Sequence, residues 1–226
     1  EPLRLELTDT ASIAACAGEA LSRSGRRIDA LFNNAGYGQL GAIEDVPIEA
    51  LRRQFEVNVI GAHELTRHIL PAMVARGHGR IVQNSSVLGL VAGPYRGAYC
   101  ASKFALEGLS DALRLELAGT GVYVSIIEPG PIRSRFIDNA LTAARASVDI
   151  DGSRHRQRYH DIIASLERGG RQTFKLEPEA VVRRLVRAIE SRRPKRRYRV
   201  TTPAHMAALA KRILPTAALD WLAARS

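Results

Sequence analysis

YCASK, residues Tyr99 to Lys103, opens the stretch that decides how this chain folds, and the stretch continues as FALEGLSDALRLELA. Apolar side chains recur along it at helical spacing, at Phe104, Leu106, Leu109, Leu113 and Leu117. This periodicity predicts a single helix with one buried face. Tyr99 and Lys103 are four residues apart, so their side chains lie on the same side of that helix.

The pairing of a phenol with an ammonium group suggests acid-base chemistry. Tyrosine ordinarily has a pKa near ~10 and exchanges protons poorly at neutral pH. An ammonium group about 4 Å away favours the phenolate by roughly 4 kcal/mol at an effective dielectric of ~20. Tyr99 would then be suited to general acid-base catalysis. From this spacing alone, the alternative is an ordinary pair on a helix surface.

Strand-like and helix-like segments alternate along the rest of the chain. Short apolar runs predict strands at 1–9, 28–32, 79–86, 122–131 and 197–203. Helical periodicity predicts helices from Ile13 to Leu21, over 48–77, over 177–193, and from His205 to Arg225 with a break at Pro215. The order predicts an α/β fold with a doubly wound, Rossmann-like parallel sheet and helices on both faces. Residues 132–175 are polar and loosely patterned, which suggests a lid over a site.

Composition indicates a single intracellular domain covering residues 1–226. The sequence has no 18-residue apolar run and no signal-peptide pattern, so we expect a cytoplasmic protein. Cys16 and Cys100 lack a C-x-x-C or histidine context, so we expect reduced thiols and no metal site. The net charge of +10 is concentrated mainly in 192–199. A solvated basic surface explains this charge without nucleic acid as a partner.

GYGQLG, from Gly36 to Gly41, has the spacing of a dinucleotide-binding loop. That loop must open directly into a helix. Here Pro47 and an acidic turn follow, and the next helix begins several residues too late. We therefore do not interpret this stretch as the phosphate-binding loop.

Five separate segments together resemble one family. They are NNAG at 33–36, NVIG at 58–61, the paired serines Ser85 and Ser86, YCASK, and PGPIRS at 129–134. Their order and spacing resemble the short-chain dehydrogenases/reductases over about three quarters of the chain. The wording YCASKFALEGL is most similar to the subgroup of hydroxysteroid and retinol dehydrogenases and bacterial aldehyde or ketone reductases.

The resemblance implies a catalytic role for four residues. Tyr99 would exchange the proton with the substrate oxygen, and Lys103 would lower the pKa of Tyr99 and bind the nicotinamide ribose. Ser86 would orient the substrate and stabilise charge on its oxygen, which a hydroxyl can do; its plain alternative is a cap at the strand end. Asn58 would distort its helix so that its carbonyl holds a water molecule linked to Lys103.

The resemblance also implies a set of binding residues. Small residues at Ala35 and Gly36 suit the approach of backbone to a dinucleotide. The cofactor contacts implied are Glu6, Leu7, Asn33, Ala35, Gly36, Tyr99, Lys103, Pro129, Gly130, Ile132 and Ser134. Asn34 is expected to brace the sheet. The substrate pocket is expected to be formed by Ser86, Val87, Leu88, Tyr95 and Tyr99, together with the segment after Ser134.

Two departures from the family pattern matter. Family members usually begin with a strand and a T-G-x-x-x-G-x-G loop, which is absent from this sequence. We therefore expect the chain to be N-terminally incomplete, without the first strands of the sheet. The second departure is Glu6, where the family commonly has aspartate. Subgroup resemblance and basic composition favour NADP over NAD.

The resemblance implies an NAD(P)-dependent oxidoreductase that interconverts an alcohol and a ketone or aldehyde by hydride transfer. The alternative is a non-catalytic dinucleotide-binding or scaffold protein on the same fold. Helices 48–77 and 99–118 are expected to form a homodimer or homotetramer, as is usual in the family. The basic, apolar C-terminal segment either packs on protein or contacts an anionic membrane surface.

Overall fold

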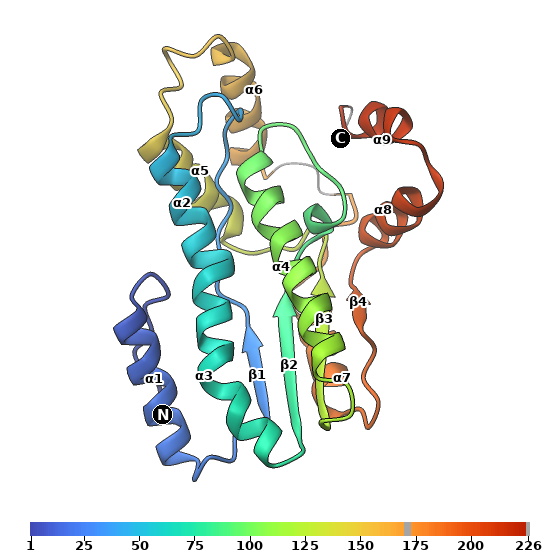
Figure 1. Ribbon diagram of the computed structural model, residues 1–226. Helices are drawn as coiled ribbons and strands as arrows, with labels where there is room; N and C mark the ends of the chain where they lie inside the picture. Colours follow the sequence, from blue (N-terminus) through green and yellow to red (C-terminus); the bar gives the residue numbers. More distant parts are fainter. Residues whose placement is uncertain (170–172, 225–226) are drawn as a thin grey trace.

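Parallel strands form the centre of the computed structural model, which describes residues 1–169 and 173–224 (Figure 1). In these residues the sheet has four strands in the order β1-β2-β3-β4, and all neighbours are parallel. The strands are β1 (Ala30–Asn33), β2 (Gly79–Asn84), β3 (Val122–Glu128) and β4 (Arg197–Arg199). The predicted strands at 28–32, 79–86, 122–131 and 197–203 are therefore confirmed. β1 starts two residues later and ends one residue later than predicted, and the other three are shorter than predicted.

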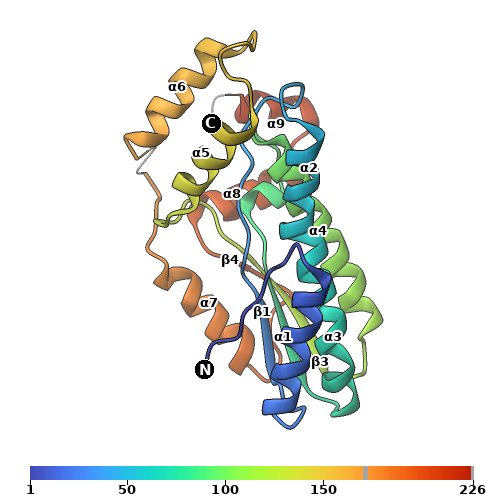
Figure 2. The ribbon, with the colours of Figure 1, turned by 90° about the vertical axis from the view of Figure 1, so that its left-hand side faces the viewer.

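Helices cover both faces of the sheet, as predicted (Figure 2). α1 (Thr10–Arg23), α3 (Gly61–Ala75) and α4 (Gly97–Glu116) lie on one face, and α7 (Glu179–Glu190) lies on the other. Side chains of β2 alternate between the two cores. Ile81 packs with α1 and α3, whereas the adjacent Val82 packs with α7. Side chains on both faces of β2 are therefore buried, as is usual in a parallel sheet.

The predicted long helix over 48–77 is built in three parts. α2 (Ile48–Phe55) is followed by a π-helical turn, Glu56–Ile60, and then by α3. π-Helical turns widen the backbone and are frequent at functional sites. Asn58 lies within this turn and is 2% exposed, so the distortion lies where the sequence has a poor helix former.

Residues after β3 form two helices above the carboxyl ends of the strands (Figures 1 and 2). These are α5 (Phe136–Ser147) and α6 (Arg156–Glu167). They occupy most of the predicted lid 132–175, of which residues 170–172 lie outside the described part of the chain. The lid is thus an ordered helical layer above the strand ends.

The C-terminal segment forms α8 (Thr202–Ile213) and α9 (Thr216–Ala223), with the predicted break at Pro215. Three apolar side chains of α8, Met206, Leu209 and Ile213, are each at least 60% exposed. This side of the helix is therefore not packed on the domain. Within the described residues, no helix has both the length and the apolarity needed to cross a membrane.

The prediction of a strand at 1–9 is wrong, because within the described residues this segment is irregular up to α1. Leu7 instead packs over the start of α3, where a Cβ added to Gly61 would collide with the Leu7 carbonyl oxygen. An isolated alternating segment gains backbone hydrogen bonds only beside another strand. β1 pairs with β2, and the segment 1–9 pairs with neither of them.

Two glycines with similar backbone angles provide a test of this packing. Gly119 and Gly121 have φ angles of +83° and +79°, but only at Gly121 would an added Cβ collide with the Gly77 carbonyl. Gly119→Ala should lower the free energy of unfolding by about 1–2 kcal/mol through strain alone. Gly121→Ala should lower the free energy of unfolding by about 1–3 kcal/mol more, because the segments that lead into β2 and β3 must move apart. Urea unfolding of both variants measures this difference, and equal losses would contradict the packing described.

Candidate active site

The segments that resemble family motifs meet at the carboxyl ends of the parallel strands. Asn34 to Gly36 follow β1, Ser85 and Ser86 follow β2, and Pro129 to Ser134 follow β3. Because the strands are parallel and adjacent, these three loops lie along one edge of the sheet. Helix α4 crosses beside them, and its N-terminal turns carry Tyr99 and Lys103.

Tyr99 and Lys103 share the buried side of α4, as their spacing predicts. They are only 8% and 4% exposed. The Lys103 Nζ donates a hydrogen bond to the Asn84 carbonyl at 2.7 Å, and it lies 5.8 Å from the centre of the Tyr99 ring. The ammonium group is therefore anchored to the end of β2, within reach of the tyrosine ring but directed at a neutral carbonyl.

The pKa of Tyr99 lies above its ordinary value, and the pKa of Lys103 lies below its own. Burial disfavours the phenolate and raises the pKa of Tyr99 to about 12, although hydrogen bonding with Ser86 opposes the rise. Burial also lowers the pKa of Lys103 to about 8, against the opposing charge of Glu107. Desolvation is thus the largest influence on the pKa of both residues.

Ser86 is a cap at the strand end, and it also lies beside Tyr99. Its Oγ accepts a hydrogen bond from the Leu88 amide at 3.1 Å and so caps the short turn Val87–Gly89. The same hydroxyl is the hydrogen-bond partner that opposes the rise in the pKa of Tyr99. Ser86 is therefore both a strand-end cap and a neighbour of the phenol.

Asn58 is locked in place by its own side chain. Its Oδ1 accepts a hydrogen bond from the Tyr37 amide at 3.1 Å, and its Nδ2 donates to the Tyr37 carbonyl at 2.9 Å. Nδ2 also donates to the Ser102 hydroxyl on α4 at 3.2 Å. A Cβ added to Gly36 would lie 3.0 Å from the Asn58 Oδ1 and 3.8 Å from the Lys103 Nζ. The π-helical turn, the loop after β1 and Lys103 are therefore in direct contact.

The loops after β1 and β3 fit main-chain contact with a dinucleotide. Ala35 and Gly36 are exposed, whereas Asn33 is buried and donates to the Thr66 hydroxyl at 2.9 Å. Asn34 accepts a hydrogen bond from the Asn84 side chain at 2.8 Å, so it braces β1 against β2 as expected. Gly36 has no side chain, which leaves room beside the buried Lys103 ammonium. One N–H of this ammonium is bound by the Asn84 carbonyl, and an ammonium has further N–H donors that suit a ribose hydroxyl.

The other predicted cofactor contacts lie in the loop after β3 and near the N-terminus. Pro129 and Gly130 are half-buried, and a Cβ at Gly130 would collide with the Thr201 hydroxyl. Ile132 pairs with Leu176, and the exposed Ser134 accepts a hydrogen bond from the Phe136 amide at 3.3 Å. The carboxylate of Glu6 is occupied locally, since it accepts hydrogen bonds from Thr8. Leu7 is half-buried over Gly61.

The lid contributes residues that the sequence did not single out. The ring of Phe136, the first residue of α5, lies 5.3 Å from the ring of Tyr99, measured between centroids. Phe136 also fills the space beside Gly38, where an added Cβ would lie 2.8 Å from the end of its ring. An aromatic residue two positions after PGPIRS was the signal available for it. The lid thus closes directly onto the tyrosine.

Polar contacts hold the lid on the loop that precedes α2. The Tyr159 hydroxyl accepts a hydrogen bond from the Ala42 amide at 2.7 Å and donates to the Asp45 carboxylate at 2.8 Å. Tyr95, a predicted substrate-pocket residue, lies on the edge of this contact and hydrogen-bonds His155 of the lid at 3.1 Å. The predicted pocket residues Val87 and Leu88 form the turn after Ser86.

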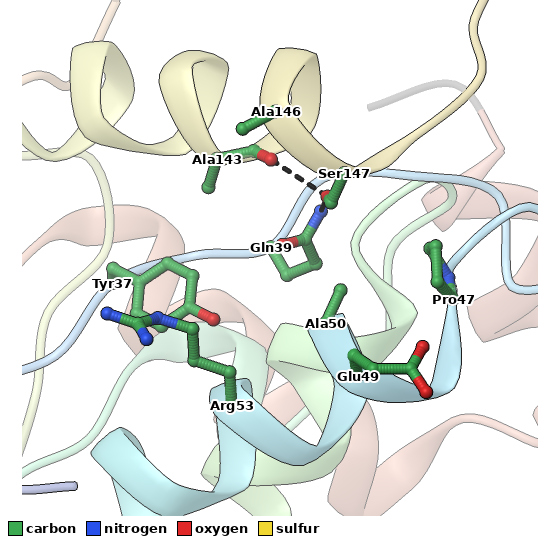
Figure 3. A pocket seen from close by; sticks show the side chains of 9 residues that line it. All are labelled: Tyr37, Gln39, Pro47, Glu49, Ala50, Arg53, Ala143, Ala146 and Ser147. Carbon is green, nitrogen blue, oxygen red and sulfur yellow. Dashed lines mark hydrogen bonds between the residues drawn. The ribbon is translucent and has the colours of Figure 1, made fainter.

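A separate pocket lies between α2 and the end of α5 (Figure 3). It has a volume of about 450 Å³, and the side chains of Tyr37 and Arg53 close one side of it. Gln39 spans it to Ser147 through a hydrogen bond of 3.0 Å. Its other lining residues are Pro47, Glu49, Ala50, Ala143 and Ala146. It adjoins the Asn58 contact through Tyr37, and it is not the pocket predicted around Tyr99.

A buried Tyr-Lys pair beside a serine, at the carboxyl edge of a Rossmann-like sheet, defines a class of nicotinamide-dependent oxidoreductases. Comparison with known proteins agrees. The family model for short chain dehydrogenases matches residues 1–145. This chain therefore belongs to the short-chain dehydrogenase family.

Individual relatives are bacterial and human oxidoreductases. An uncharacterized oxidoreductase of Escherichia coli K12, YbbO, is 41% identical over 217 residues, which cover 96% of this chain and 74% of that protein. Human 17-beta-hydroxysteroid dehydrogenase type 1 is 35% identical over 201 residues, which cover 89% of this chain and 60% of that protein. The chain thus also resembles the hydroxysteroid dehydrogenases, as its motif wording predicts.

Solved structures match the whole sheet. A short-chain dehydrogenase from Burkholderia phymatum in complex with NAD is 27% identical with a TM-score of 0.76, covering 97% of this chain and 76% of that chain. A second, from Burkholderia cenocepacia in complex with NADP, is 24% identical with a TM-score of 0.72, covering 98% and 77%. The second similarity supports the fold alone.

The lid contacts give a prediction that is independent of any ligand. Tyr159→Phe removes a hydroxyl that joins two groups of the opposite loop, so it should destabilise the lid by about 1–3 kcal/mol. Amide hydrogen exchange in α6 should become faster, while exchange in α1 stays unchanged. Tyr123→Phe is the control, because Tyr123 lies on β3, outside the lid contacts, and is 39% exposed. Unchanged exchange in α6 would contradict the role of Tyr159.

Proposed function

We propose that this protein interconverts an alcohol and a ketone or aldehyde, with Tyr99 as the general acid-base residue and a nicotinamide dinucleotide as cofactor. The observation that carries the proposal is the burial of Tyr99 and Lys103 together beside Ser86, at the sheet edge where the family motifs meet. Hydride transfer between carbon atoms is the chemistry that a bound nicotinamide supplies.

Each protein residue has a defined part in this reaction. The Tyr99 hydroxyl gives a proton to the substrate oxygen during reduction and takes it back during oxidation. The Ser86 hydroxyl donates to the same oxygen and stabilises its developing charge. Lys103, held by the Asn84 carbonyl, places positive charge near the phenol and favours its deprotonation. Asn58 keeps the loop after β1 in contact with Lys103.

Burial gives Tyr99 a resting form that suits reduction. Since burial raises its pKa to about 12, the phenol is protonated at neutral pH and ready to donate. Removal of water by the Phe136 ring strengthens the hydrogen bonds that the two hydroxyls make to a substrate oxygen. Oxidation instead requires the phenolate, so it should be favoured at higher pH than reduction.

We propose NADP as the preferred cofactor, with NAD as the alternative. The net charge of +10 favours the dinucleotide with the additional phosphate. Fluorescence titration of the protein with NADPH and with NADH tests this preference. Tighter binding of NADH would contradict it.

Replacement of the phenol is the direct test of the catalytic proposal. Tyr99→Phe should reduce turnover of an aldehyde and ketone panel by at least about 100-fold, because the general acid-base group is lost. Binding of NADPH should be nearly unchanged, and Tyr123→Phe should retain full turnover. Normal turnover in Tyr99→Phe would sink the assignment. Tight NADPH binding without oxidation in the unaltered protein would support a non-catalytic scaffold instead.

We also propose that α3 and α4 pair with a second copy of this chain. Their outer faces form a shallow groove of about 180 Å³, in which Leu70, Leu109 and Leu113 are flanked by Arg67 and Glu116. An apolar centre with charged residues of both signs at its edge suits a self-complementary interface.

The oligomer can be tested on a single helix. Leu109→Glu buries a charge in the proposed interface, so it should shift the sedimentation coefficient of the protein to that of a smaller species. Leu115→Glu is the matched control, because Leu115 lies on the same helix, is 67% exposed and is outside the groove. A smaller species for both variants, or for neither, would contradict this interface.

A further inference from the structure

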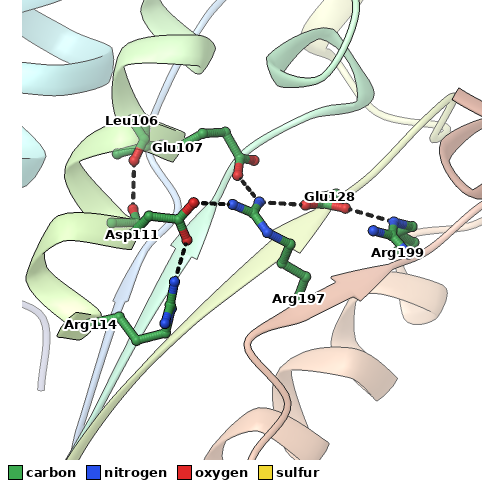
Figure 4. Close-up of polar contacts among 8 residues, drawn as sticks. Leu106, Glu107, Asp111, Arg114, Glu128, Arg197 and Arg199 are labelled. Atoms are coloured by element: carbon green, nitrogen blue, oxygen red, sulfur yellow. Dashed lines mark hydrogen bonds and ion pairs between the residues drawn. The ribbon is translucent and has the colours of Figure 1, made fainter. Parts of the chain in front are cut away.

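A cluster of buried charges begins one helical turn after Lys103 (Figure 4). Glu107 follows Lys103 on the same side of α4 and is 6% exposed. Glu128, the last residue of β3, is fully buried, and the side chain of Arg197 from β4 lies between the two carboxylates. Helix α4 and strands β3 and β4 therefore bring these three charges together behind the candidate active site.

Arg197 holds this cluster together. Its Nη1 donates to the Glu107 carboxylate and, at 2.8 Å, to the Glu128 carboxylate, and its Nη2 donates to Asp111 at 2.5 Å. Arg199 pairs with Glu128 at 3.2 Å, and Arg114 pairs with Asp111 at 3.0 Å. Each carboxylate thus has a guanidinium partner, which is the condition for burying charges without a large penalty.

Glu107 also faces the active-site side of this cluster. A Cβ added to Gly89 would lie 2.8 Å from the Ser85 Oγ, 3.1 Å from the Glu107 Cγ and 3.2 Å from the Lys103 carbonyl oxygen. These groups therefore pack together under the turn that follows Ser86. Arg197 donates to Glu107 Oε2, and Ser85 is a further hydrogen-bond partner of the Glu107 carboxylate.

Lys103 is influenced by a nearby negative charge, that of Glu107. Its Nζ donates to the neutral Asn84 carbonyl and lies near Gly36 and the Tyr99 ring. Burial lowers the pKa of Lys103 to about 8, and the Glu107 charge is the influence that opposes this. Burial raises the pKa of Glu107 as well, and the Glu128 charge adds to this rise. The hydrogen bond with Ser85 and the charge of Arg197 oppose it and favour the ionised form of Glu107.

We propose that Glu107, held by Arg197, is a positioning residue that keeps the Lys103 ammonium protonated. This inference rests on the proposed function in one respect, which is that Lys103 acts beside Tyr99. Glu107 itself touches neither the substrate nor the reacting atoms. It supplies a fixed negative charge behind the lysine, and Arg197 connects that charge to β3 and β4. Without it, a lysine in this desolvated site would lose its proton more readily.

The test is a titration of Lys103 in the full-length protein by ¹³C NMR of its Cε, assigned by its loss in Lys103→Arg. Glu107→Gln should lower the midpoint by about 1 pH unit, since a buried opposite charge is removed. Glu107→Asp should restore most of the shift. Asp111→Asn is the matched control: it removes a carboxylate from the same arginine, one turn further from Lys103, and should shift the midpoint by less than half as much.

The pH dependence of kcat/KM provides a second readout. The limb that reports loss of the Lys103 proton should move to lower pH in Glu107→Gln by the same amount as the NMR midpoint. Arg197→Lys keeps the positive charge but loses the guanidinium group that binds two carboxylates at once. It should shift the NMR midpoint and the kcat/KM limb in the same direction by a smaller amount. This variant replaces Glu107→Gln if that variant fails to fold. An unchanged Lys103 midpoint in the folded variants overturns this proposal. Normal turnover in Tyr99→Phe would overturn the proposed function, whatever Lys103 does.

Discussion

The hydrogen bond from the Lys103 ammonium to the Asn84 carbonyl, 2.7 Å long, ties helix α4 to the end of strand β2. It fixes the rotation and the height of α4 relative to the sheet, and with them the place of Tyr99, one turn earlier on the same side. Ser86 follows Asn84 by two residues, so the same contact brings the serine beside the phenol. The candidate catalytic groups thus share one rigid junction between a helix and a strand, as precise positioning requires.

Burial of Tyr99 and Lys103 costs free energy because it removes polar groups from water. The fold offsets this cost on both sides of the pair. On the solvent side, the Phe136 ring excludes water from Tyr99, while Asn58 satisfies its polar atoms with the Tyr37 backbone and Ser102. On the inner side, Glu107 and Arg197 place paired charges under the helix. A buried cation without such partners would favour its neutral form. The charge cluster therefore offsets the cost of burying the same pair, Tyr99 and Lys103, although Arg197 and Glu128 lie outside the segments that resemble the family.

The sequence predicted what depends on local patterns. Strand and helix order, the parallel sheet and the shared side of Tyr99 and Lys103 follow from periodicity and spacing. The strand predicted at 1–9 failed because pairing depends on a neighbour, and Leu7 packs on α3 instead. Burial raises the pKa of Tyr99 through tertiary packing, including the contact with the Phe136 ring of α5, and a local pattern does not predict such packing. Contacts such as Tyr159 with Asp45, 114 residues apart, leave no trace in a local pattern.

The lid and the catalytic pair rest on different supports, and this separation has consequences for specificity. Tyr99 and Lys103 are fixed by α4 and β2, which are core elements with buried backbone. The lid is fixed by hydrogen bonds from Tyr159 and His155 to the loop around Asp45 and to Tyr95. Changes in lid sequence can therefore alter the surroundings of Tyr99 while the contact between Lys103 and Asn84 stays in place. Under the proposed function, such an arrangement would let one junction serve different substrates, because function depends on the site built onto a fold.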